Sequence, residues 1–298
     1  MRTTATSVPT AAGDLRAVVW RPDHDELMPG VVLVDGALEG TADDTWASLA
    51  DLVVEYGAVA ISHDKPGCGG SPGDWREQSL HDRALESLAA AEVLRKRPGV
   101  DPDRVGLLGV SQGGWVAYLA ASLAPEAIRH VVSVSGPGVT PAEQERYRIG
   151  IAVAGDPEAM AWVDERTRRL MAGEDHSSIL ASQLQYADRP WYQSACAYYD
   201  KPEMLPLFVR IGFFDPAPVL PLVRCPVFAA FGGADDSTPV YRSVEVLSRL
   251  LPANPRHAIA VYPEADHGLQ VDRQDGARLR DRLAPGFLPM LSAWLRSS

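Results

Sequence analysis

The residue with the clearest chemical signature is Ser111, which stands in the pattern G-x-S-x-G with Gly109 and Gly113 on either side. An apolar run over 104–110 precedes the serine, and a helix-like stretch over 115–123 follows it. A serine at the tip of such a strand-to-helix turn is held in a strained backbone conformation. Small neighbours are needed there because the strand and the helix pass so close together. The pattern therefore predicts an exposed nucleophilic hydroxyl.

A serine hydroxyl is a poor nucleophile at neutral pH, so it needs an adjacent base, which in turn needs an orienting carboxylate. His267 follows the expected last strand, and the carboxylates Asp235 and Asp236 follow the expected buried strand 226–231. Together with Ser111 they give the chain order serine, acid, histidine at three strand ends. In this arrangement the chain resembles the α/β-hydrolase family, which carries its catalytic triad in that order.

The resemblance implies a role for each of these residues. Segment 231–239 is similar to the family's acid loop G-x-x-D-x-x-x-P, so Asp235 is expected to be the acid. Asp236 stays open as the alternative, because a shift by one residue is easy to misjudge from sequence. His267 matches the family's histidine and is expected to take the proton of Ser111 and later to protonate the leaving group.

Members of the family also bind the developing oxyanion with two backbone N–H groups, one after the nucleophile and one in the loop after an early strand. By position these belong to Gln112 and to Ala37 in the loop 34–40. Asp35 stands where the family usually has histidine, and Glu39 adds a second carboxylate. These two acids either cap backbone groups or favour a cationic or hydroxyl-rich substrate.

A glycine-rich segment at 64–71 fits the family's turn D-x-x-G-x-G-x-S. Glycine-rich loops can bind phosphate, but the lysine of a P-loop does not follow this one. We therefore interpret the segment as a structural turn beside the nucleophile.

The apolar runs along the chain predict an α/β fold. After an N-terminal hairpin over 4–22, strands alternate with helices, which indicates a mostly parallel, doubly wound sheet with right-handed crossovers. The expected buried strands are 31–34, 59–61, 104–110, 130–134, 226–231 and 257–262. The expected helices are 44–56, 80–95, 115–123, 240–250 and 285–296.

The alternation lapses over 139–222, which has helical character and holds ten of the 22 aromatic residues. We interpret this segment as a helical cap inserted into a core domain formed by 1–138 and 223–298. Most of its aromatics are expected to form the cap's own small core, with a few lining a ligand pocket. The candidates for substrate binding, including two residues of the 34–40 loop, are Leu38, Glu39, Trp162, Trp191, Tyr192, Tyr198 and Phe213.

Composition narrows the class of protein. The 298 residues carry a net charge of −11, which argues against nucleic acid and anionic membranes as partners. The three cysteines show no metal-type spacing and fit a reduced compartment. The first ten residues lack the apolar core of a signal peptide, and no stretch approaches the roughly 20 apolar residues of a membrane span. We expect a cytoplasmic protein.

The resemblance is closest to carboxylesterases and dienelactone-hydrolase-like members. It implies a serine hydrolase that cleaves an ester or thioester of a small organic molecule through an acyl-enzyme, without a metal or organic cofactor. One alternative is a biosynthetic acyltransferase, cyclising thioesterase or lyase that uses the same triad. A second is a non-catalytic small-molecule binding protein on the same scaffold. A homodimer is left open.

Overall fold

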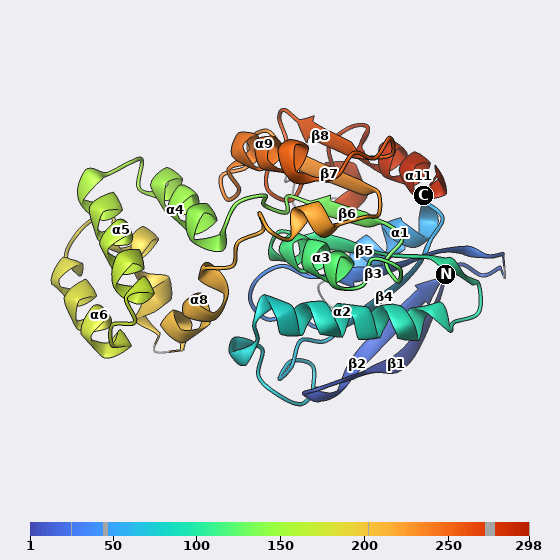
Figure 1. Ribbon diagram of the computed structural model, residues 1–298, viewed down its shortest axis with the longest axis horizontal. Coiled ribbons are helices and arrows are strands. Elements are labelled where there is room, and N and C mark those ends of the chain that lie inside the picture. Colours follow the sequence, from blue (N-terminus) through green and yellow to red (C-terminus); the bar gives the residue numbers. More distant parts are fainter. Residues whose placement is uncertain (25, 44–46, 202, 272–277, 298) are drawn as a thin grey trace.

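The computed structural model describes residues 1–24, 26–43, 47–201, 203–271 and 278–297. Eight strands form one sheet in the order β1-β2-β4-β3-β5-β6-β7-β8 (Figure 1). The strands from β3 onward pair in parallel, whereas β2 runs antiparallel to both β1 and β4. The expected mostly parallel sheet is confirmed. The strand bounds are β1 Arg2–Thr10, β2 Gly13–Arg21, β3 Met28–Val34, β4 Val59–His63, β5 Val100–Val110, β6 Val131–Val134, β7 Val227–Gly232 and β8 Ala258–Tyr262.

Helices cover both faces of the sheet because its central strands are apolar on both sides. Val32 of β3 packs in one cluster with residues of α2, α3 and α9, whereas its neighbours Val31 and Leu33 pack on the opposite face with α1 and α11. This alternation is the period of two that a strand imposes. The helix bounds are α1 Ala47–Glu55, α2 Leu80–Arg95, α3 Gln112–Leu123, α9 Val240–Leu250, α10 Leu279–Arg282 and α11 Phe287–Ser297, with a short 3₁₀ turn η1 at Trp75–Glu77.

A helical insertion separates β6 from β7, as expected from the sequence, and lies beyond one end of the sheet in Figure 1. Asp156 caps α5 and Thr140 caps α4, each followed by a proline at the first helical turn. We call this insertion the cap. Its helices are α4 Pro141–Ala152, α5 Pro157–Met171, α6 His176–Gln183, α7 Tyr192–Ala195 and α8 Met204–Gly212, with 3₁₀ turns η2 Leu184–Tyr186, η3 Ala197–Asp200 and η4 Leu220–Leu222.

The cap holds together through its own apolar cluster. Its buried members, each less than a tenth exposed, include Trp162, Trp191, Tyr192 and Leu205. Burial of large aromatics is worth more than any surface contact, because it removes the most apolar area from water. The cap therefore has a core that does not depend on the sheet.

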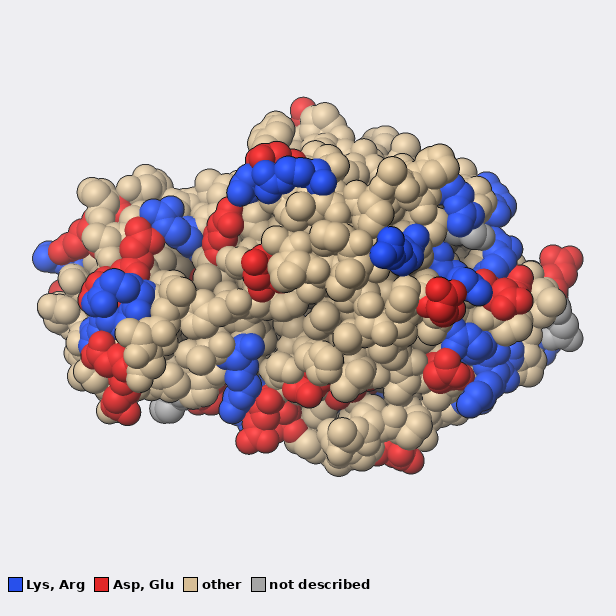
Figure 2. Space-filling view, in the orientation of Figure 1, with Lys and Arg blue, Asp and Glu red and all other residues tan. Residues whose placement is uncertain are grey.

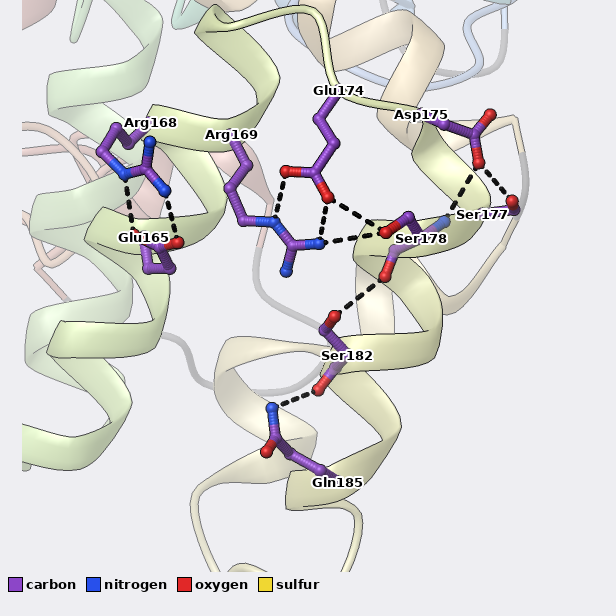
Figure 3. Close-up of polar contacts among 9 residues, drawn as sticks. All are labelled: Glu165, Arg168, Arg169, Glu174, Asp175, Ser177, Ser178, Ser182 and Gln185. Carbon is purple, nitrogen blue, oxygen red and sulfur yellow. Dashed lines mark hydrogen bonds and ion pairs between the residues drawn. The ribbon is translucent and has the colours of Figure 1, made fainter.

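Polar pairs decorate the outer surface of the cap. Arg168 pairs with Glu165 along α5, and Arg169 reaches Glu174 in the turn before α6 (Figure 3). Acidic and basic side chains are interspersed over the cap in Figure 2, whereas the middle of that face is largely uncharged. Exposed pairs of this kind contribute little to stability. They make the cap surface polar, and the buried aromatics stabilise it.

Element boundaries differ from expectation in a few places. Strand β5 begins at Val100, because Val100 pairs with Met28 before the expected apolar run begins. The expected helix 44–56 is observed as α1, and residues 44–46 lie outside the described residues. Among the described residues, no helix is both long enough and apolar enough to span a membrane.

Candidate active site

Ser111 lies at the turn between β5 and α3, with backbone angles φ 54° and ψ −120°. Its N–H donates to the Val134 carbonyl at 2.8 Å, which fixes the turn against β6. A Cβ atom at Gly109 would lie 2.1 Å from the Gly113 carbonyl oxygen, and one at Gly113 would lie 2.2 Å from the Val34 carbonyl oxygen. Both positions therefore exclude a side chain, for the reason of close strand–helix passage that the sequence pattern suggests.

Asp235 and His267 are brought together by the loops that follow β7 and β8. The Nδ1 atom of His267 lies 3.0 Å and 2.9 Å from the two carboxylate oxygens of Asp235. The Asp235 side chain is fully buried and also accepts the backbone N–H groups of Ser237 and Thr238, each at 2.8 Å. This carboxylate is thus held in place by two backbone donors, as an orienting group requires.

Asp236 has a different environment. It is exposed, and the described contact of its carboxylate is with the hydroxyl of its neighbour Ser237 at 3.4 Å. Of the two acids that the sequence left open, the geometry brings Asp235 to the histidine. The sequence favoured Asp235 and kept Asp236 as the alternative, because the choice depends on the φ/ψ path of a tight turn.

Ser111 and His267 line one cavity of about 540 Å³ between the sheet and the cap. The sheet side of this cavity includes the predicted oxyanion-hole residues Ala37 and Gln112. A Cβ atom at Gly36 would lie 3.5 Å from the Ser111 Cβ and 4.0 Å from its Oγ, so the loop after β3 lies directly against the serine. All these groups follow the carboxyl ends of parallel strands, where ligands bind in open α/β sheets.

The cap supplies the opposite wall, to which α4 contributes five lining residues and α8 contributes four. The four residues of α8 line the cavity at spacings of three and four positions: Met204, Leu207, Phe208 and Ile211. That spacing marks one face of a helix. This spacing of apolar residues is visible in the sequence, whereas the density of aromatic residues does not reveal it.

The predicted substrate-binding residues divide into two groups. Leu38 and Tyr198 line the cavity. Trp162, Trp191 and Tyr192 do not, because they are 4–6% exposed and fill the cap's own core, where Tyr186 lies between the two tryptophan rings at centroid distances of 5.3 and 5.2 Å. The two tryptophans of the cap and Tyr192 thus serve its packing.

Phe213 and Glu39 are also placed away from this cavity. Phe213 packs edge-on against Phe208, with ring centroids 5.9 Å apart, and so lies one layer behind the lining. Glu39 lines a separate surface hollow beside the glycine-rich turn. Both corrections arise because neighbours in the sequence can face opposite ways in a turn or at a helix end.

Two charged side chains of α4, Glu145 and Arg148, also line the cavity. These side chains form a two-bonded pair at 2.8 Å and 2.8 Å, and the Tyr199 hydroxyl donates to Glu145 at 2.7 Å. Burial acts to raise the pKa of Glu145, but the hydrogen bonds and the charge of Arg148 outweigh it and leave that pKa below its ordinary value. A carboxylate and a guanidinium therefore face the cavity as a charged pair.

Asp35, the residue that stands where the family usually has histidine, is bound to two cationic side chains. Its carboxylate pairs with Arg83 at 2.6 Å and with Lys65 at 3.3 Å, and it lies so close to Gly40 that a Cβ atom there would be 1.8 Å away. The partners are 30 and 48 positions distant in the chain, beyond the reach of any local pattern. Within the described chain, no group of three or more His, Cys, Asp or Glu side chains is placed to hold a metal ion.

Comparison with known proteins extends this description. Residues 14–280 match the model of the alpha/beta hydrolase family. The chain is 23% identical over 223 residues to the mitochondrial palmitoyl-protein thioesterase ABHD10 of Homo sapiens, covering 75% of this chain and 62% of that protein. It is 26% identical over 121 residues to esterase FrsA of Photobacterium profundum, covering 41% of this chain and 28% of that one.

These matches span less than two thirds of the length of either relative. Among solved structures, the chain resembles a putative dienelactone hydrolase from Klebsiella pneumoniae, with a TM-score of 0.60 and 18% identity, over 100% of this chain and 99% of that one. At such low identity the structural likeness supports the fold alone, whereas the family match over residues 14–280 supports membership of the family. The chain belongs to the alpha/beta hydrolase family.

Proposed function

We propose that this protein is a serine hydrolase that cleaves an ester or thioester of a small organic substrate through an acyl-enzyme. The observation that carries the proposal is the buried Asp235 carboxylate on Nδ1 of His267, with that histidine and Ser111 lining one cavity. The relatives named as an esterase and a thioesterase support the same reaction class.

In this reaction Ser111 attacks the carbonyl carbon while Nε2 of His267 takes the hydroxyl proton. Asp235 holds the imidazole by Nδ1, so that the other ring nitrogen is the one free to act as base. The backbone N–H groups of Ala37 and Gln112 stabilise the tetrahedral oxyanion. The protonated histidine then gives its proton to the leaving alcohol or thiol, and water releases the acyl group by the same steps in reverse.

The test is covalent labelling of the serine. A fluorophosphonate probe is expected to add one label per chain, which peptide mass spectrometry locates on Ser111. Prior treatment with an excess of an ester substrate should slow this labelling, because the acyl group occupies the same oxygen. Labelling that persists undiminished in Ser111→Ala would contradict the proposal.

The nature of the leaving group is tested separately. p-Nitrophenyl esters of increasing acyl length and the matching acyl-thioesters are compared by kcat/KM. If the protein is labelled at Ser111 and has the higher kcat/KM for one of the two series at every acyl length, that series identifies the leaving group as an alcohol or a thiol. Absence of turnover on both series, with labelling intact, would favour acyl transfer to a nucleophile other than water.

Truncation of Phe208 is expected to change selectivity for the acyl group. Phe208→Ala removes apolar lining area, worth about 1–3 kcal/mol, so kcat/KM for a long acyl ester should fall by roughly 5- to 150-fold. The acetyl ester, whose acyl group has little apolar area to bury, should react nearly as before. The matched control is Phe213→Ala, whose ring touches Phe208 but does not line the cavity. Equal losses for both esters would mean that α8 acts only as scaffold.

A further inference from the structure

Two cationic side chains are buried behind the loop that follows β3. The side chains of Lys65, from the glycine-rich turn, and Arg83, from α2, are 4% and 8% exposed. Among the described residues, Asp35 is the carboxylate within ion-pair distance of both. Glu86, one turn further along α2, is the other acid near Arg83, and burial raises the pKa of its carboxyl. Two cations and two carboxylates thus lie together behind the loop.

The donors of these cations are directed at the backbone of the loop. Lys65 Nζ donates to the Gly36 carbonyl at 2.7 Å and also to the Leu38 carbonyl. Arg83 donates to the Gly36 carbonyl at 3.2 Å and to the Asp35 carbonyl at 2.7 Å. The carbonyl oxygens of Asp35, Gly36 and Leu38 are therefore held by two side chains from elsewhere in the chain.

The Gly36 carbonyl and the Ala37 N–H belong to the same peptide group. Donors that bind the carbonyl oxygen polarise that group and strengthen the N–H as a donor. Arg83 also donates to the side-chain oxygen of Gln112, the residue that carries the other N–H of the proposed oxyanion hole. The Arg83 guanidinium thus binds the peptide group that carries the Ala37 N–H and the side chain of Gln112.

Burying two cations is unfavourable for folding, since desolvation costs several kcal/mol per ion. Such an arrangement is what electrostatic catalysis uses, because a fixed charge in a site of low dielectric acts strongly on charge that develops during the reaction. The negative charge of a tetrahedral intermediate would develop on the cavity side of the same loop.

We propose that Lys65 and Arg83 are positioning residues that hold and polarise the oxyanion-hole loop, and so stabilise the transition state of acyl transfer without touching the substrate. The inference rests on the proposed serine-hydrolase function. It assigns a role to the lysine of the glycine-rich turn, which the sequence alone presented as structural.

Single substitutions separate this role from a structural one. In Lys65→Met, Asp35 keeps Arg83 as its partner, and in Arg83→Met it keeps Lys65, so neither variant leaves an isolated buried carboxylate. Removing one partner of a buried ion pair is destabilising, although the remaining cation limits the loss in each variant. Both variants are therefore expected to lower Tm, and their kinetics are compared at a temperature where each is fully folded.

Their kinetics should change in kcat and leave KM nearly unchanged. We expect kcat to fall by about 10- to 100-fold in each variant. Removal of an oxyanion donor itself lowers kcat more, by on the order of 10²–10³. The matched control is Arg95→Met, also on α2, whose side chain pairs with Glu92 and the Ala127 carbonyl away from the site. It should retain the kcat of the unsubstituted protein.

The pH profile provides an independent readout. Burial lowers the pKa of Lys65 to about 8, while Asp35 opposes this effect and Arg83 adds to it. The other groups close to the ammonium are Cys68 of the same turn and the ring of Trp75 at 5.8 Å, and the adjacent Asp64 is bound to Arg16 and Ser71. Lys65 is cationic below its pKa, so kcat should decline as pH rises through about 8. This alkaline limb should be absent from Lys65→Met.

A trifluoromethyl ketone, which forms a charged tetrahedral adduct with a catalytic serine, tests the link to the oxyanion. Its inhibition constant should rise by the same factor as kcat/KM falls across the unsubstituted protein and both variants. Unchanged kcat in both variants, or a lower kcat with an unchanged inhibition constant, would overturn the inference. Failure of the proposed function looks different, because then the unsubstituted protein shows no Ser111-dependent ester or thioester cleavage.

Discussion

Ser111→Ala is expected to lower kcat on the best ester or thioester by on the order of 10⁶, as loss of a triad serine does in enzymes of this mechanism. Residual turnover would come from binding and from the oxyanion hole alone. The fold should be unaffected, because Ser111 makes its described hydrogen bonds through its backbone, to the Val134 carbonyl and from the Gly114 N–H. Steady-state kinetics and a Tm measurement on the same preparation check both parts.

A second substitution at this position tests the strain of the turn. The angles φ 54° and ψ −120° at Ser111 fall in a region that glycine adopts readily and other residues do not. Ser111→Gly should therefore be inactive yet more stable than Ser111→Ala, by about 1–3 kcal/mol in the free energy of unfolding. If the two inactive variants unfold at the same denaturant concentration, the turn stores no such strain.

Asp235→Asn should lower kcat by on the order of 10⁴. An asparagine oxygen can still accept the N–H groups of Ser237 and Thr238, so the loop should keep its shape. Its amide would, however, present N–H groups to Nδ1 of His267 and would favour the tautomer that cannot take the serine proton. KM should change little, because Asp235 does not line the cavity.

The control for this experiment is the neighbouring acid. Asp236→Asn removes the same charge one residue away, on a side chain that is exposed and distant from the imidazole contact. Its kcat should stay within about twofold of the unsubstituted protein, as for surface substitutions generally. If Asp236→Asn were the more damaging change, the role of the acid would move to Asp236.

Those parts of the site that depend on local backbone chemistry could be predicted from the sequence. The glycines around Ser111 and the loop at Asp235 mark turns that few other residues permit, and the strands before them are continuous apolar runs. The order of these elements then predicts the sheet, because parallel strands with helical crossovers have few allowed arrangements.

What could not be predicted depends on contacts between distant segments. The carboxylate of Asp35 meets partners at positions 65 and 83, and no pattern of spacing reports that meeting. Aromatic density likewise misled us about the cavity. Trp162 and Trp191 fill the core of the cap, because large rings bury the most apolar area, while α4 and one face of α8 supply much of the cavity lining.

The presence of four lining side chains on one short helix of the cap bears on how such a protein could diversify. Met204, Leu207, Phe208 and Ile211 lie within one nine-residue helix, whereas the proposed catalytic groups come from four different strand ends. A few point mutations in this segment could reshape the cavity without altering any of the proposed catalytic groups. A combinatorial library at these four positions would sample many shapes of the cavity in a single selection, without any change to the rest of the fold.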